Sequence, residues 1–222
     1  LILSSLLKQD SIYETFPVFS ADGRSLYFCA ARALPEDSHQ LDSIRYNLCR
    51  IDFDPATGTF GSRIDTIVNA EAMHKSLSFP RPSYDGRFLC YTLSDYGQFS
   101  IWHHEADLYL LNLSTGESCP MDGANSDDTE SFHNWSTNSR WLVLSSRRDD
   151  GLFTRPYFCH VDANGTVSKA FMLPQRNPRR FYRERFFSFN VPDFVIAPTH
   201  FDSHHASRII NDDYRKDFGV RK

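Results

Sequence analysis

The nonapeptide FPVFSADGR occupies residues 16–24, and two close copies of it, FPRPSYDGR and FHNWSTNSR, occupy residues 79–87 and 132–140. The copies align without gaps, with an aromatic residue first, a serine fifth, a turn-forming pair seventh and eighth, and an arginine last. The matching residues are Phe16, Phe79 and Phe132, then Ser20, Ser83 and Ser136, then Asp22–Gly23, Asp85–Gly86 and Asn138–Ser139, then Arg24, Arg87 and Arg140. Self-similarity of this kind indicates a chain built from repeated structural units.

An alternating apolar run follows each copy, as in Leu26 and Phe28 or Leu89 and Tyr91. A period of two predicts a strand with one buried face. Asp-Gly favours the reversal of a hairpin, and Asn138 keeps the third turn viable because asparagine tolerates a positive φ. A second strand, a glycine-containing turn and a short last strand follow in each unit. Each unit therefore predicts a four-stranded antiparallel meander, which is the form of a propeller blade.

The predicted fold class is all-β, a β-propeller arc of about three four-stranded antiparallel blades. Since propellers close with roughly four to eight blades, the arc is expected to be part of a larger propeller. The expected divisions are an outer strand of a preceding blade or a linker (1–10), three blades (11–70, 71–124 and 125–174) and a C-terminal extension (175–222). The extension is expected to hold a mobile tail and a further strand, since FNVPDF at 189–194 echoes the start of the repeat.

Composition and charge narrow the function. The 222 residues are 41% hydrophobic, which is a globular composition, and the net charge of −4 gives no electrostatic case for binding nucleic acid. No apolar stretch approaches the roughly 20 residues of a membrane-spanning helix. The arginine-rich stretch RNPRRFYRER at 176–185 is interpreted as a solvated linker rather than a nucleic-acid patch. The five cysteines form no C-x-x-C pair and are expected to be buried free thiols.

The repeated polar residues resemble a catalytic set but recur once per unit, so we interpret them as a structural turn motif. Carboxylates and hydroxyls at such turns accept hydrogen bonds from the local backbone. The motif contains Ser20, Asp22, Gly23 and Arg24, then Ser83, Asp85, Gly86 and Arg87, then Ser136, Asn138 and Arg140. No residue of the chain is predicted to be catalytic.

The candidate binding residues are aromatic residues and histidines that do not recur: Trp102, His103, His104, His133 and Trp135. An aromatic group at the mouth of a propeller can hold a peptide side chain or a sugar ring, although large aromatic residues are more often core. Adjacent histidines on a strand point to opposite faces, and the chain has neither an H-x-H pair nor H-E-x-x-H. We therefore predict no metal and no cofactor.

The repeat, over roughly residues 11–174, resembles the TolB-type, WD-like β-propeller repeat, from which the third copy departs at Asn138–Ser139. The tryptophan-containing stretch 98–113 and SFNVPDF at 188–194 resemble the C-terminal part of envelope proteins of Bacteroidetes-type bacteria. That resemblance implies a non-enzymatic protein-binding or scaffolding module in the periplasm or outer cell envelope, within a protein that carries a lipoprotein signal. A protein partner is expected, and carbohydrate stays open as a ligand.

Two enzyme interpretations stay open beside it. Oligogalacturonate lyases are propellers of related repeat type, and that family binds a metal through histidines. An accessory propeller of a hydrolase is the other, although the chain has no G-x-S-x-G motif.

Overall fold

Strands dominate the chain, whose computed structural model describes residues 11–35, 40–198 and 202–212. They form three antiparallel sheets of four strands each. The first sheet contains β1 (Ile12–Phe19), β2 (Ser25–Arg32), β3 (Asn47–Asp54) and β4 (Thr59–Val68). The second contains β5 (Ser76–Pro82), β6 (Phe88–Ser94), β7 (Asp107–Asn112) and β8 (Ser118–Pro120). The third contains β9 (Glu130–Trp135), β10 (Trp141–Ser146), β11 (Arg155–His160) and β12 (Phe171–Met172).

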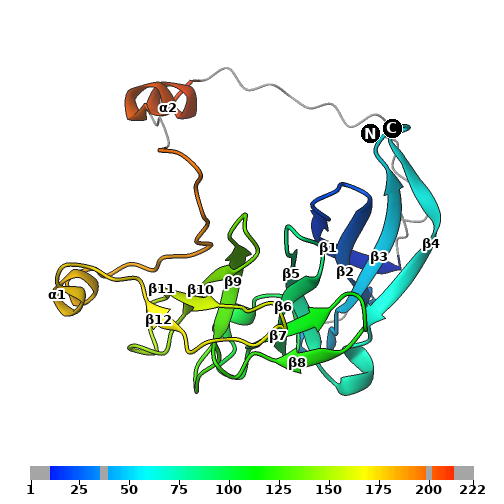
Figure 1. The fold of residues 1–222 in the computed structure, drawn as a ribbon, viewed down its shortest axis with the longest axis horizontal. Helices are drawn as coiled ribbons and strands as arrows, with labels where there is room; N and C mark the ends of the chain where they lie inside the picture. Colours follow the sequence, from blue (N-terminus) through cyan, green and yellow to red (C-terminus); the bar gives the residue numbers. More distant parts are fainter. Residues whose placement is uncertain (1–10, 36–39, 199–201, 213–222) are drawn as a thin grey trace.

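Within each sheet the strands follow one another in chain order, so each sheet is a meander. The sheets succeed one another across the molecule (Figure 1), and the first strands of neighbouring sheets, β1, β5 and β9, lie against one another. One apolar core fills the space between the first and second sheets, and another fills the space between the second and third. The predicted all-β arc of three antiparallel blades is confirmed.

The repeated turn residues make the same hydrogen bonds in all three sheets. In the first copy, Ser20 Oγ donates to Asp22 Oδ1 over 2.6 Å, and the same carboxylate oxygen accepts from the Arg24 amide over 3.0 Å. Asp85 and Asn138 receive the equivalent bonds in the other copies. Because each side chain serves its own turn, the geometry supports a structural role for the motif.

The third turn corrects one expectation, because the residue with a positive φ is Ser139 and not Asn138. Ser139 has φ 57°, where the other turns have Gly23 at 69° and Gly86 at 70°. The buried Ser139 hydroxyl accepts a hydrogen bond from the Asp85 amide of the neighbouring sheet over 2.9 Å. A serine therefore replaces glycine where its hydroxyl ties two successive turns together.

The first residue of each copy lies in a bulge. Phe16, Phe79 and Phe132 have φ values of 51°, 52° and 48°. At each one, two residues of the first strand oppose a single residue of the second strand. The three rings form a column, with centroids 4.1 Å apart between Phe16 and Phe79 and 4.8 Å between Phe79 and Phe132. Ring packing at this column offsets the roughly 1–2 kcal/mol cost of each left-handed residue.

Residues 188–194 take the place of the first strand of a fourth unit. Val191 has φ 48° and precedes a proline, as Phe16 and Phe79 do. The Phe189 amide donates to Thr154 O over 3.0 Å, and the equivalent Leu77 and Glu130 amides donate to Tyr46 O and Ala106 O over 2.9 and 2.8 Å. The segment is not a regular strand, and its sequence lacks the turn motif that ends the other copies.

Two short helices, α1 (Pro178–Arg183) and α2 (Ser203–Ile210), lie in the C-terminal extension, and α2 lies apart from the three sheets (Figure 1). No helix among the described residues is long and apolar enough to cross a membrane. The strand or linker expected at residues 1–10 lies outside the described residues, as do residues 213–222 of the expected tail.

Candidate functional site

The structure separates the five candidate binding residues into two places. Trp102, His103 and His104 lie together in the loop between β6 and β7, whereas His133 and Trp135 lie within β9. The two groups differ in exposure, because Trp102 is 71% exposed while His133 and Trp135 are buried. The loop group therefore lies at the surface, whereas the side chains of His133 and Trp135 lie within the fold.

Trp102 is held in place although it is exposed. The Arg147 guanidinium lies 5.3 Å from the centroid of the indole ring. Arg147 Nη1 also donates to Ile101 O over 3.4 Å, and its Nη2 donates to Gly151 O. Phe99, in the loop between β6 and β7, is 70% exposed, and Leu152, in the loop between β10 and β11 that also contains Arg147, is 69% exposed. We call Phe99, Trp102 and Leu152 the loop surface: three exposed apolar side chains on two loops that Arg147 joins, because Arg147 bonds Ile101 O on one loop and Gly151 O on the other.

The histidines beside the loop surface are each paired with one carboxylate. His103 Nδ1 lies 2.9 Å from Glu105 Oε1, and its ring packs edge-on against Tyr96 at 4.5 Å. His104 Nδ1 lies 3.1 Å from Asp128 Oδ1. No group of three or more histidine, cysteine, aspartate or glutamate residues that could hold a metal occurs within the described part of the chain. These pairs position the loops.

His133 is a core residue. It is 1% exposed, and its Nε2–H donates to Cys90 O over 3.0 Å. Burial lowers the pKa of His133 to about 3, so the imidazole is neutral near neutral pH. His133 is therefore a buried, neutral side chain whose hydrogen bond joins β9 to β6 of the neighbouring sheet.

Trp135 is likewise enclosed but borders a cavity that the sequence did not predict. Its Nε1–H donates to Arg81 O over 2.9 Å. The cavity, of about 300 Å³, is lined by the third residue of each copy and of the fourth segment, namely Val18, Arg81, Asn134 and Asp193, together with Phe19, Pro82 and Tyr84. We call it the axial cavity. These third positions vary from copy to copy, but so do the fourth and sixth, so the repeat alone does not single them out and only the fold brings them together.

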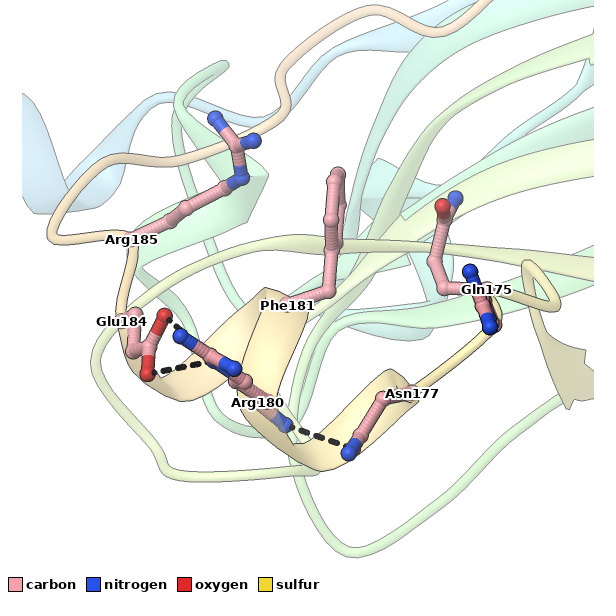
Figure 2. A pocket seen from close by; sticks show the side chains of 7 residues that line it. Gln175, Asn177, Arg180, Phe181, Glu184 and Arg185 are labelled. Carbon is pink, nitrogen blue, oxygen red and sulfur yellow. Dashed lines mark hydrogen bonds and ion pairs between the residues drawn. The ribbon is translucent and has the colours of Figure 1, made fainter.

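A second cavity, of about 430 Å³, lies beside α1 and is lined by the arginine-rich stretch (Figure 2). Arg180 Nε forms an ion pair with Glu184 at 3.0 Å, and Arg185 stacks on Phe181 at 4.3 Å. Asn177 caps the helix by accepting the Arg180 amide. Within this cavity Glu184 is thus the counter-ion of Arg180, while the Phe181 ring packs against Arg185.

The fold resembles solved propellers at low sequence identity. A puromycin-hydrolyzing peptidase from Mycobacterium tuberculosis has 13% identity and a TM-score of 0.51, covering 74% of this chain and 24% of that one. An oligogalacturonate lyase in complex with manganese has 14% identity and a TM-score of 0.50, covering 76% and 44%. TolB from Acinetobacter baumannii has 17% identity and a TM-score of 0.40, covering 71% and 32%.

No protein-family model and no curated protein matches the chain. The chain spans less than half the length of each of these three structures. What the likeness shows is the fold: the chain is a β-propeller module of three four-stranded sheets that match part of larger propellers.

Proposed function

We propose that this β-propeller module is a non-enzymatic binding or scaffolding unit that recognises a protein partner through the loop surface. The observation that carries the proposal is the exposed Trp102, ordered by Arg147, which also joins the two loops that carry the exposed Phe99 and Leu152. Soluble proteins seldom leave several large apolar side chains exposed together without using them for binding. We further propose that the module works in the periplasm or outer cell envelope, as its repeat resemblance implies.

The proposal follows from the energetics of interfaces. Tryptophan is enriched among residues that contribute about 2 kcal/mol or more to binding. Such residues bind best when they are held in the bound geometry beforehand, because little side-chain entropy is then lost. The guanidinium over the Trp102 ring and its hydrogen bond to Ile101 O supply that order without covering the ring.

The test is retention of envelope proteins on immobilised protein, compared between the wild type and Trp102→Ala. We expect one or more retained proteins to lose at least tenfold in abundance with the variant, as removal of an interface tryptophan predicts. Phe186→Ala is the matched control, since Phe186 is 83% exposed but lies in the C-terminal extension.

Equal loss with Trp102→Ala and Phe186→Ala would contradict recognition by the loop surface. Metal analysis of the purified chain separates the proposal from a metal-dependent lyase. Stoichiometric metal that disappears on His103→Ala or His133→Ala would favour the lyase and count against the binding module.

A further inference from the structure

We propose that the axial cavity is a binding site for a carboxylate carried on an apolar or aromatic group, with Arg81 holding the carboxylate. The cavity lies where the third residues of four successive inner segments meet. This site is separate from the loop surface and does not depend on the function proposed for it.

Arg81 is fixed before any ligand arrives. Its Nε–H donates to Asn134 Oδ1 over 3.0 Å, while Asn134 Nδ2 donates to Pro192 O over 2.7 Å. Trp135 holds the Arg81 carbonyl. Asn134 can make both hydrogen bonds in only one orientation of its side-chain amide. The two bonds that connect Arg81 to Pro192 through Asn134 therefore fix the direction of the Arg81 Nε–H. The guanidinium is thus presented by three inner segments in one geometry.

The outer part of the guanidinium is available to an acceptor. Arg81 Nη1 makes one long bond of 3.3 Å to Pro80 O, and Nη2 has no acceptor among the described residues. No carboxylate in the described ranges lies within 4.0 Å of Arg81. Arg81 is only partly exposed, and this burial lowers the pKa of its guanidinium. A half-buried guanidinium without a close counter-ion gains most from a bidentate carboxylate.

The other walls of the cavity favour an apolar neighbour for that carboxylate. Phe19, Pro82 and Val18 line it, and Tyr84 and Trp135 add aromatic surface. Ligand sites commonly combine such apolar walls with a few fixed polar groups that orient the ligand. A cavity of about 300 Å³ is at the small end of ligand sites, so a single ring with one carboxylate is the size that fits.

Asp193 restricts the charge of the ligand. It lines the same cavity, and its attraction offsets part of the effect of burial on Arg81. A second negative charge on the ligand would meet Asp193, so a monocarboxylate is favoured over a polyanion.

The experiment is a titration of the full chain with phenylacetate, followed by the NMR resonance of the Trp135 indole N–H, which bonds Arg81 O. We expect saturable shifts with a Kd of about 1 mM, as suits a small ligand, and none with phenylacetamide, the neutral analogue. Arg81→Gln should weaken binding roughly tenfold or more, because a charged hydrogen-bond donor is lost.

Asp193→Asn gives a second and opposite readout, because removing a like charge should strengthen phenylacetate binding by about threefold. Arg63→Gln, which changes a well-exposed arginine on β4, should leave it unchanged. Absence of saturable binding, equal binding of phenylacetamide, or weaker binding by Asp193→Asn would overturn the proposal. The comparison of Asp193→Asn with the wild type tests the proposal even if Arg81→Gln does not fold.

Discussion

His133 illustrates how position in the fold changes what a side chain can do. The sequence makes His133, on the first strand of a blade, a candidate binding residue. In the structure it faces Cys90 O inside the core, with its pKa lowered to about 3 by burial. The residue is therefore a structural donor whose protonation opposes folding.

This leads to a pH prediction at the level of one residue. The unfolded chain binds a proton at His133 below about pH 6.5, whereas the folded chain does not until about pH 3. The unfolded state therefore binds more protons in that window, and stability falls as the pH falls. Relative to His133→Gln, the wild type should lose about 1.4 kcal/mol of unfolding free energy per pH unit below about pH 6.5. Urea titrations between about pH 7 and pH 5 measure it, and parallel profiles would disprove it.

The sequence could identify an exposed candidate residue only where that residue lies in a long polar loop. The loop between β6 and β7 is polar and long, and its Trp102 is exposed as such loops allow. Trp135 has the same residue type, but it is buried because it ends β9 against the second sheet. Arg81 could not be found, because its partners Asn134 and Pro192 are distant in sequence and meet only when the sheets are stacked.

At the scale of the element, the hairpin turn after each first strand is the best-predicted feature. Asp-Gly is a turn signal, and the structure has Gly23 and Gly86 with positive φ. The third turn uses Ser139 in the same conformation and obtains an inter-sheet hydrogen bond from its hydroxyl. Strain and hydrogen bonding therefore act in opposite directions at one residue.

Two substitutions of Ser139 separate these effects. Ser139→Ala keeps the left-handed strain and leaves the Asp85 amide without its partner, so we expect a loss of about 1–2 kcal/mol of unfolding free energy. Ser139→Gly also loses the bond but relieves the strain, so we expect a change of less than about 1 kcal/mol. Chemical denaturation measures both. If Ser139→Gly were as damaging as Ser139→Ala, the strain would not matter.

The bulge at the start of each copy could not be predicted. Phenylalanine rarely adopts a positive φ, so nothing in its side chain indicates Phe16, Phe79 or Phe132. The reason lies in the neighbouring sheets, since the ring of each residue packs on the ring of the next. Tertiary packing sets this local conformation.

At the scale of the molecule, Arg155 fastens the C-terminal extension to the third sheet. Arg155 is 2% exposed and donates to Phe187 O over 2.9 Å and to Tyr182 O over 3.0 Å. Its guanidinium also lies 5.6 Å from the centre of the Tyr182 ring. One side chain thus bonds two backbone carbonyls of the segment that leads into residues 188–194.

Replacing Arg155 should free that segment. Lysine keeps the charge but lacks the planar fork that reaches two carbonyls, so Arg155→Lys should leave at least one of them without a partner. We expect amide hydrogen exchange to speed up at least tenfold in residues 182–189, while exchange in β6 stays as in the wild type. Arg63→Lys is the matched control, because Arg63 is well exposed. Unchanged exchange in 182–189 would show that Arg155 does not anchor the extension.

The repeat was sufficient to predict the number of sheets and their antiparallel order, because each copy encodes its own turn and strands. It was insufficient for residues 188–194, where Val191 replaces the aromatic residue and the turn motif is missing. The position of that segment is fixed by bonds to Thr154 and Asn134 of the preceding unit.

The bulges also make some parts of the chain far less tolerant of length changes than others. Side chains alternate between the two faces of a strand. The extra residue at Phe16, Phe79 or Phe132 therefore decides which face each of the following side chains occupies. Losing one residue there would move the side chains of the rest of the strand from the core face to the solvent face, and the reverse. A loop that connects two strands has no such alternation, so losing one residue there does not exchange the faces of a strand, and evolution is freer to alter the loops than the innermost strands.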